Sequence, residues 1–427
     1  MKPSFCLLTA TLLLSGLALP ARAQWQTYTT ANSGLHSNVV REVTTDENGH
    51  LWVATQAAVQ RFDGTTWTTY TQAHGLDYGT IKCVAARGGV VWVGHDRGLS
   101  RFDGAAWTNF TNAADLPVGL FGPTDRSITD VVIGPDGTVW LAGSRGLGRY
   151  DGSTWRKYNR SNSGLQEEAI TALALDEGLN TLWIGTNCNS AQGGVYALNL
   201  TASSWRYFNM AGRNCVHGLA VSTAGTVFVG TCNASGLTTI DAGTGTRGAV
   251  TSSGCVTLDG VAADPTDPDR AWVVAEQMGA SPTPYGLLAY DGRRGTFVEQ
   301  HVPSSTGLPS HNVSSVSAQR VGSGQRVWVG TTDRGLAVYQ AVVSSSRRPA
   351  DAPALALSPN PATETVEVAA APPGARLAVY DNAGRLVYAA PVAAAPVRLD
   401  VRSWPAGLYH LRLSSAQGTR TGRLLKH

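Results

Sequence analysis

One short phrase recurs seven times along the chain and limits what the chain can fold into. In each copy an aromatic residue stands between apolar residues, and successive copies lie 40 to 56 residues apart. The seven aromatic residues are Trp52, Trp92, Trp140, Trp183, Phe228, Trp272 and Trp328. A period of roughly 40–50 residues in a strand-rich chain is typical of a β-propeller, in which each repeat forms one blade. We therefore predict an all-β ring of seven blades.

The first repeat shows the expected unit most clearly. Residues 38–46 alternate as a first strand, and a turn containing Gly49 leads to a second strand at 50–55. Residues 58–63 and 65–71 supply a third and a fourth strand. Four antiparallel strands of this length make one blade, and the aromatic residues of the phrase are expected to fill the seams between blades.

Composition agrees with short strands joined by tight turns. Only 15% of the 427 residues are charged, and the chain contains 48 glycines and 12 tryptophans. The formal net charge is +3, which gives no electrostatic reason to expect a nucleic-acid partner.

An Asp-Gly pair follows the third strand of several units. In this position Asp accepts backbone hydrogen bonds and Gly tolerates positive φ, so we interpret the pairs as hairpin turns and not as metal or catalytic sites. The pairs begin at Asp63, Asp103, Asp151 and Asp291. A Trp then opens the fourth strand at Trp67, Trp107 and Trp155, with Trp205 as the expected equivalent.

The two ends of the array are complementary. The seventh unit has strands at 313–320, 326–331 and 335–340 but no fourth strand before a serine run. The segment 25–29 has the fourth-strand pattern and stands alone before the first unit. We therefore predict that 25–29 adds to the last blade, which closes the ring and removes open strand edges. The predicted propeller spans residues 24–343.

The amino-acid sequence of the repeats also resembles that of a known family. The segments 94–104 (GHDRGLSRFDG) and 331–339 (TTDRGLAVY) resemble two-component regulator propeller repeats, found in the periplasmic sensor regions of hybrid histidine kinases. In such sensors a membrane helix and a kinase domain follow the propellers, and the sequence contains no kinase domain. The resemblance therefore implies a ring with a binding role and no kinase activity.

The first 23 residues have the pattern of a secretory signal peptide. Lys2 provides a positive start, residues 5–19 form an apolar run, and Ala21-Arg22-Ala23 is a small-x-small cleavage site. The apolar run is short for a membrane anchor. We expect cleavage before Gln24.

The character of the chain changes after the propeller. Residues 344–353 are polar and contain prolines, as in a linker, and 354–427 alternate as short strands that suit a small immunoglobulin-like β-sandwich. Four ordered motifs, at 357–361, 379–387, 404–409 and 422–426, resemble the type A sorting domain of the type IX secretion system. The motif residues are Pro359, Asn360, Pro361, Gly384, Gly407, Tyr409, Gly422 and Lys426.

That second resemblance implies a route and a set of partners. It places the protein in a Bacteroidetes-type bacterium and implies passage through the periplasm to an outer-membrane translocon that reads the domain. A surface sortase would then remove the domain and could attach the cargo to a lipopolysaccharide. The alternative for this segment is an ordinary adhesive sandwich, and the ordered motifs favour the sorting domain.

Five cysteines remain after the predicted leader, and four of them fall between residues 188 and 255. Cys188 and Cys232 follow second strands, whereas Cys215 and Cys255 begin the next first strands. Because these strand ends lie on one propeller face, we predict disulfides Cys188–Cys215 and Cys232–Cys255. The alternative pairs Cys215 with Cys232 within one blade. Cys83 lies mid-strand and is expected to be a buried free thiol.

The same face, formed by the entries to first strands and the exits from second strands, is the predicted ligand site. Polar side chains there could converge on a ligand around the propeller axis. The candidates are His36, Asn38, Arg41, Tyr78, Lys82, Asp96, Arg97, Arg126, Arg145, His217, His311, Asn312, Asp333 and Arg334.

Three repeated loops suggest the chemistry of the ligand. Arg97, Arg145 and Arg334 each precede a glycine and would surround the mouth with guanidinium groups, which bind carboxylate or sulfate in a bidentate manner. The favoured hypothesis is recognition of an acidic glycan or peptide, with no cofactor or metal. Two alternatives are a metal-dependent lyase, for which Glu167, Glu168 and Glu276 could supply carboxylates, and a purely structural or adhesive surface protein.

Overall fold

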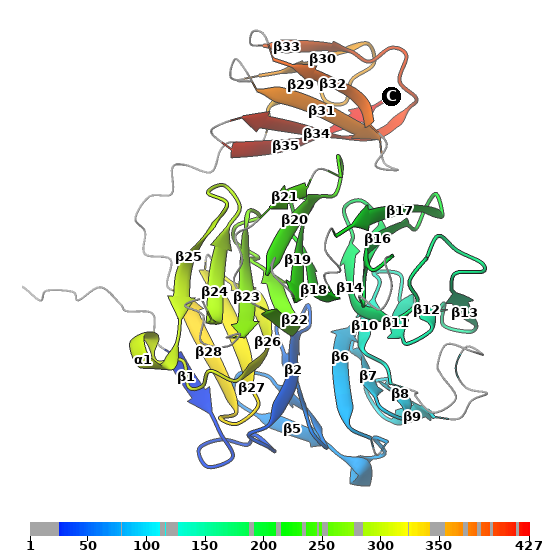
Figure 1. The fold of residues 1–427 in the computed structure, drawn as a ribbon. Helices are drawn as coiled ribbons and strands as arrows, with labels where there is room; N and C mark the ends of the chain where they lie inside the picture. Colours follow the sequence, from blue (N-terminus) through cyan, green and yellow to red (C-terminus); the bar gives the residue numbers. More distant parts are fainter. Residues whose placement is uncertain are drawn as a thin grey trace, which may run out of the picture.

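A computed structural model shows seven four-stranded antiparallel sheets around a central axis, followed by a two-sheet sandwich (Figure 1). The fold is therefore the predicted all-β, seven-bladed propeller with a small β-sandwich. The structure describes residues 25–77, 79–111, 116, 127–187, 192–210, 215–232, 236–245, 247–249, 255–276, 285–322, 324–341, 355–369, 375–381, 386–392, 396–415 and 418–427.

Strands follow one another from the axis outwards in every blade. Blade 1 contains β2 (Val40–Thr45), β3 (Leu51–Thr55), β4 (Val59–Phe62) and β5 (Trp67–Tyr70). Blade 2 contains β6 (Ile81–Arg87), β7 (Val90–His95), β8 (Gly98–Phe102) and β9 (Trp107–Phe110). Blade 3 contains β10 (Asp130–Ile133), β11 (Val139–Gly143), β12 (Gly146–Tyr150) and β13 (Trp155–Tyr158). Blade 4 contains β14 (Ile170–Asp176), β15 (Thr181–Thr186), β16 (Gly194–Asn199) and β17 (Ser204–Asn209).

Blades 5 to 7 repeat this order. Blade 5 contains β18 (Cys215–Val221), β19 (Thr226–Cys232), β20 (Leu237–Asp241) and β21 (Arg247–Ala249). Blade 6 contains β22 (Cys255–Ala263), β23 (Arg270–Glu276), β24 (Gly286–Asp291) and β25 (Thr296–His301). Blade 7 contains β26 (Val313–Val321), β27 (Gly324–Thr331), β28 (Leu336–Ala341) and β1 (Trp25–Tyr28). Two short helical turns, η1 (Gln72–His74) and α1 (Pro303–Thr306), lie between blades.

The ring closes through the pairing of its two ends. β1 runs antiparallel to β28 with Trp25 opposite Tyr339 and Tyr28 opposite Leu336, where the repeat count places the segment 25–29. Each first strand also contacts the first strand of the next blade, and β26 contacts β2. The chain therefore forms a continuous ring without a seam at its start.

The recurring aromatic residues lie in the core, as predicted. None of the seven is more than 4% exposed, and they pack in clusters that span neighbouring blades. One sheet cannot bury both of its faces alone, so these flat side chains fill the space between blades.

The Asp-Gly pairs are turns, also as predicted. Asp63 Oδ1 accepts hydrogen bonds from the amides of Thr65 and Thr66, and the Asp151 carboxylate accepts equivalent bonds from Ser153 and Thr154. The backbone bonds from Thr66 and Thr65 lower the pKa of Asp63 to about 2. These carboxylates are therefore occupied by their own loops.

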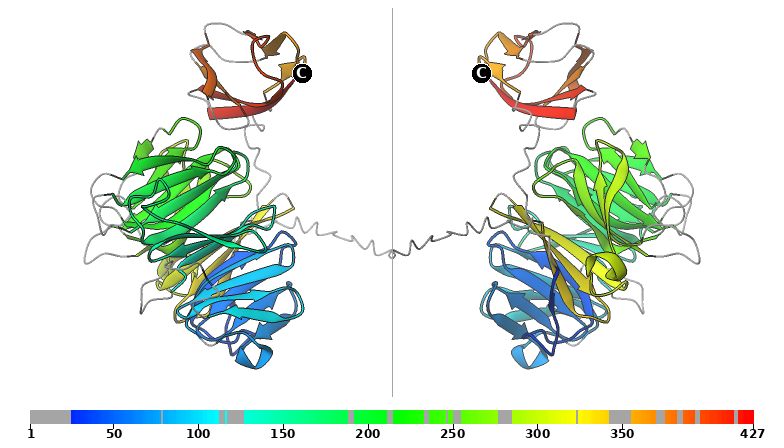
Figure 2. Two further views of the ribbon diagram at one scale, coloured as in Figure 1. Left: turned by 90° about the vertical axis from the view of Figure 1, so that its right-hand side faces the viewer. Right: turned by 90° about the vertical axis from the view of Figure 1, so that its left-hand side faces the viewer.

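The C-terminal sandwich consists of two sheets. One contains β29 (Leu357–Ser358), β30 (Thr365–Val368) and β33 (Val397–Asp400). The other contains β32 (Leu386–Pro391), β31 (Arg376–Asp381), β34 (Gly407–Ser415) and β35 (Gly418–Lys426). The two sheets enclose one apolar core. Figure 2 shows the sandwich, in orange to red, beyond the ends of the green blades.

The predicted domain boundaries remain predictions. The signal peptide at 1–23 and the linker at 344–353 lie outside the described residues, as do Tyr78, Arg126 and Gly384. In the part of the chain that the structure describes, no helix is long and apolar enough to cross a membrane.

Two of the four clustered cysteines lie at strand ends of blade 5. Cys188 and the side chain of Cys255 lie outside the described residues. Cys215 and Cys232 occupy opposite positions on β18 and β19, and neither is a free thiol. Both predicted pairs and the alternative pair therefore remain open. Cys83 is the buried free thiol expected from its place in the strand.

Candidate functional site

A glycine at the start of the third strand fixes the loops that carry the three predicted arginines. A Cβ atom on Gly98, Gly146 or Gly335 would lie 2.3 Å from a carbonyl oxygen of the neighbouring fourth strand. The three glycines also have φ values of 139°, 134° and 82°, which other residues adopt only with strain. In blades 2, 3 and 7 the third strand therefore approaches the fourth so closely that this position requires glycine.

The residue before each glycine consequently occupies the same place in its blade. Arg97, Arg145 and Arg334 hold this position in blades 2, 3 and 7, and all three are exposed. The amide of Arg334 donates to Thr331 Oγ1 at 3.0 Å, and the amide of Arg97 donates to His95 Nδ1 at 3.3 Å. The backbone is thus anchored at Arg334 and Arg97.

Arg145 and Arg334 are available to a ligand. Arg145 and Arg334 form no ion pair with any described residue. Blade 1, between blades 7 and 2, has the small Ala57 at the equivalent position.

Tyr285 occupies the same position in blade 6 and was missed by the sequence reasoning. It precedes Gly286, whose Cβ would lie 2.4 Å from the carbonyl oxygen of His301. The Tyr285 ring lies 5.1 Å from the ring of the predicted residue His311. The signal that could have identified it is its place before the glycine that opens a third strand.

Several other predicted residues anchor loops of this face. Asn312 Nδ2 donates to Asp333 Oδ2 at 3.2 Å, which joins two predicted residues of blade 7. Asp96 Oδ1 accepts from the amide of Thr80 at 3.1 Å, and Asn38 Oδ1 accepts from the amide of Thr30 at 3.0 Å.

His36 lies on the same face with an exposed side chain. Its amide donates to the buried Gln60 Oε1 at 2.7 Å, which fixes the loop before blade 1.

Three further predicted residues, Arg41, Lys82 and His217, lie at β-bulges in first strands. A bulge turns one side chain towards the next blade. The ring of His217 contacts the carbonyl oxygen of Val256 at 3.0 Å through Nδ1, so it joins blades 5 and 6. Thr171 and Ser314 form similar bonds at the same position in blades 4 and 7. Arg41 and Lys82 are exposed there and add two cations beside the arginine loops.

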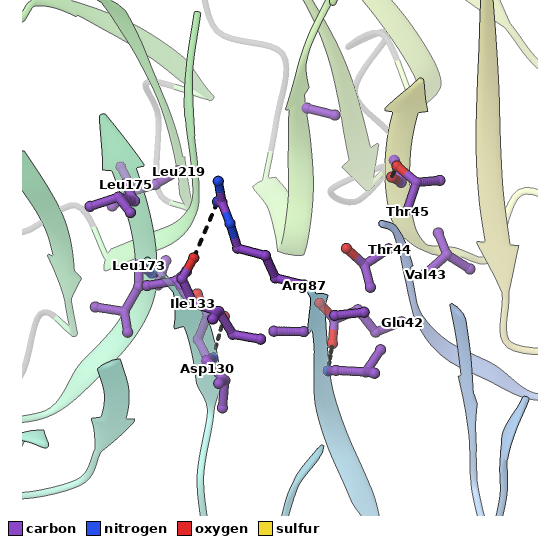
Figure 3. Close-up of a pocket in the computed structure, with 18 of the residues that line it drawn as sticks. Glu42, Val43, Thr44, Thr45, Arg87, Asp130, Ile133, Leu173, Leu175 and Leu219 are labelled. Carbon is purple, nitrogen blue, oxygen red and sulfur yellow. Dashed lines mark hydrogen bonds between the residues drawn. The ribbon is translucent and has the colours of Figure 1, made fainter. Parts of the chain in front are cut away.

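A cavity lies on the axis of the ring and was not predicted. It has a volume of about 590 Å³ and is lined by the first strands of all seven blades (Figure 3). The cavity extends to Glu47 and Glu177 in turns between first and second strands, so it opens on the face opposite the arginine loops.

Two carboxylates of this cavity join neighbouring blades. Glu42 and Asp130 hold the equivalent position in β2 and β10, one residue beyond the bulge position. Glu42 Oε2 accepts from the amide of Val84 at 2.5 Å, and Asp130 Oδ2 accepts from the amide of Leu173 at 2.6 Å. Burial raises the pKa of Asp130 to about 7, although its bonds from the amides of Leu173 and Val131 act in the opposite direction.

An ion pair crosses one end of the cavity. Arg87 Nη1 on β6 lies 2.5 Å from Glu177 Oε1 in the turn after β14, and it also contacts the carbonyl oxygen of Ile133 at 3.4 Å. The pair links blade 2 with blade 4. Figure 3 shows the extended Arg87 side chain and its bond towards Ile133 of blade 3. The cavity is thus partly occupied by the protein's own charged groups.

Two of the carboxylates named for the lyase alternative, Glu167 and Glu168, accept hydrogen bonds from backbone amides of their own loop. Glu167 is buried, and its Oε1 accepts from the amides of Glu168 and Ala169. Glu168 accepts from the amide of Arg160, and the side chain of Glu276 lies outside the described residues. Among the residues that the structure describes, no three His, Cys, Asp or Glu side chains form a group that could hold a metal.

The motif residues of the sandwich converge in space. Asn360 Nδ2 donates to the carbonyl oxygen of Arg423 at 2.6 Å, and Asn360 Oδ1 accepts from the amide of Leu425 at 2.9 Å. Tyr409 donates to the carbonyl oxygen of Pro405 at 2.7 Å. The first and last motifs are therefore joined although more than 60 residues separate them. Residues 356–427 match the family model of the secretion system C-terminal sorting domain.

This segment is a secretion system C-terminal sorting domain. The sorting domain indicates that the protein is exported to the outer cell surface and interacts with the type IX secretion machinery. No curated protein matches the chain.

Solved structures with the same fold include proteins of the cell surface. One is PorZ of Porphyromonas gingivalis, an essential surface component of the type IX secretion system, with a TM-score of 0.58, 17% identity and coverage of 94% of this chain and 61% of PorZ. Another is the extracellular domain of the hybrid two-component system BT3049 of B. thetaiotaomicron, with a TM-score of 0.56, 19% identity and coverage of 92% and 52%.

An enzyme shares the propeller as well. The virginiamycin B lyase of Staphylococcus aureus has a TM-score of 0.56 and 13% identity, with coverage of 75% of this chain and 99% of the lyase. Since the chain spans only about half to three fifths of PorZ and BT3049, these likenesses establish the fold alone.

Proposed function

We propose that the exported protein is a surface recognition module that binds an acidic glycan or peptide at the loop face of its propeller. The observation that supports this most is the equivalent placement of Arg97, Arg145 and Arg334 on glycine-anchored loops of blades 2, 3 and 7. Guanidinium groups bind carboxylate or sulfate through paired hydrogen bonds, and fixed loops reduce the entropy lost on binding.

The position of the sorting domain supports the choice of face. The turns that line its contact with the propeller, at 176–179 and 222–225, connect first to second strands. The arginine loops connect second to third strands at the opposite ends of the blades. A ligand could therefore reach the arginine face while the sorting domain is still attached.

Tyr285 suggests how the ligand body would bind. An aromatic ring beside cationic groups suits a sugar ring or an aromatic side chain, which packs on the ring while its acidic groups reach the arginines.

We further propose the finer steps of export that the sorting domain suggests: an N-terminal signal peptide, recognition by the outer-membrane translocon, removal by a sortase and attachment to lipopolysaccharide.

The test is an array of sulfated and carboxylated glycans and acidic peptides, followed by calorimetric titration of any hit. The Arg97→Ala/Arg334→Ala double variant should lose at least tenfold in affinity. Arg398→Ala, which removes an exposed arginine of the sandwich, should bind as the unchanged protein does. Equal affinity of the double variant and the unchanged protein would refute this site.

A further inference from the structure

An ion pair between β34 and β20 joins the sorting domain to the propeller. Arg412 on β34 pairs with Asp241 at the end of β20 in blade 5. Both side chains are largely buried, with 19% and 17% of their surfaces exposed. A charge pair withdrawn from solvent to this degree is sensitive to the loss of either partner.

A ring from the sandwich packs on the propeller backbone next to this pair. Tyr380 on β31 is 4% exposed. A Cβ atom on Gly243, in the turn after β20, would lie 2.9 Å from Tyr380 Cζ. A side chain at position 243 would therefore displace the Tyr380 ring.

Charged side chains from both domains lie at the contact. A cavity of about 360 Å³ lies between them. The propeller contributes Asp176 to its wall, and the sandwich contributes His410, Arg412 and Arg423. Figure 1 shows β34 and β35 facing the ends of the green blades.

The polar groups of the contact are incompletely satisfied. Tyr380 Oη, Arg412 Nε and Asp176 Oδ2 are buried without a hydrogen-bond partner. Burial lowers the pKa of Arg412 and raises that of Asp176. Buried polar atoms without partners weaken an interface, so this contact combines specific pairing with a low cost of opening.

We propose that the sorting domain docks reversibly on its own propeller through Arg412–Asp241 and Tyr380–Gly243, and that docking shields the face formed by Tyr380, His410 and Arg412. The face would become accessible to the secretion machinery only when the contact opens. The proposal does not depend on ligand binding at the arginine loops, which lie at the other ends of the blades.

Charge reversal in the full-length protein tests the docking. Small-angle X-ray scattering should give a larger maximum dimension for Asp241→Arg and for Arg412→Asp than for the unchanged protein. Hydrogen exchange should rise at 241–245 and in β34. The double variant Asp241→Arg/Arg412→Asp should restore the dimension, because the pair is re-formed with its charges exchanged.

Two further variants keep the test decisive. Asp241 also accepts from the amide of Thr244 at 2.8 Å, so its replacement could disturb the turn. Gly243→Leu should open the contact by steric exclusion of Tyr380 without removing that bond. Arg398→Asp, outside the contact, should leave the dimension unchanged. Unaltered scattering for all three opening variants, or a double variant as open as the single ones, would overturn the proposal.

Discussion

Trp25, near the start of the chain, lies directly opposite Tyr339 in the last propeller strand, with their ring centroids 5.3 Å apart. The Trp25 ring also lies 5.6 Å from His301 of blade 6. One side chain from the closing strand therefore contacts two blades that the chain reaches about 300 residues later. Closure of the ring depends on side-chain packing as well as on the backbone pairing of β1 with β28.

The first prediction concerns this closure. Trp25 is 9% exposed, so Trp25→Ala should lower the free energy of unfolding by roughly 3–5 kcal/mol and increase hydrogen exchange along β28. Trp155→Ala removes the equivalent fourth-strand ring of blade 3, which is less buried and belongs to a strand continuous with its own blade. Denaturant titration should therefore show a smaller loss for Trp155→Ala, and an equal or larger loss would contradict the role of Trp25 in closure.

A second prediction concerns the glycines behind the arginine loops. Gly98→Ala would place a methyl group 2.3 Å from the carbonyl oxygen of Phe110, in addition to the strain of φ 139°. We expect a loss of roughly 2–4 kcal/mol in unfolding free energy. Gly152→Ala is the matched control, because φ is 98° but nothing lies within 4 Å of the added atom, so it should lose only about 1 kcal/mol. Similar losses in thermal or chemical unfolding would show that backbone strain alone requires Gly98.

The third prediction is a pH dependence set by Asp130. Its pKa is raised by burial to about 7 in the folded state, from an ordinary value of 3.8. Between these two values the folded protein binds more protons than the unfolded chain, so the contribution of Asp130 to stability falls as pH rises from about 4 to 7. Asp130→Asn removes this titration. The difference in unfolding free energy between the two proteins, measured at pH 5 and at pH 7.5, should shift in favour of the variant at the higher pH, whereas a constant difference would contradict the raised pKa.

Much of the fold could be predicted because its determinants are local and repeated. The aromatic phrase, the Asp-Gly turns and the orphan segment before the first unit each report on one blade, and seven copies make the period visible. The sandwich was predicted from motifs that Asn360 brings together. The loops of Arg97 and Arg334 were visible because the glycine that fixes them is adjacent in sequence.

Contacts between distant segments could not be predicted in this way. Glu42 and Asp130 bind amides of the next blade, and a single Glu or Asp in a first strand carries no sign of that partner. Tyr285 occupies the same position in its loop as the arginines, before the glycine that opens a third strand. It carries no charge, so a pattern defined by arginine does not identify it. The pairing of Arg412 with Asp241 joins two domains, and neither residue is part of a motif.

The last prediction concerns the cysteines of blades 4 to 6. We expect Cys188–Cys215 and Cys232–Cys255, since each pair would join the exit of a second strand to the first strand of the next blade. Peptide mapping of the full-length protein without reduction should recover these two linked pairs, and reduction should lower the unfolding free energy by roughly 2–4 kcal/mol for each bridge. Cys83→Ser is the control, because Cys83 is a buried free thiol and its replacement should leave the map unchanged. Cys215 and Cys232 lie opposite each other on β18 and β19, so recovery of a Cys215–Cys232 peptide would instead place a single bridge within blade 5 and reject the stapling of neighbouring blades.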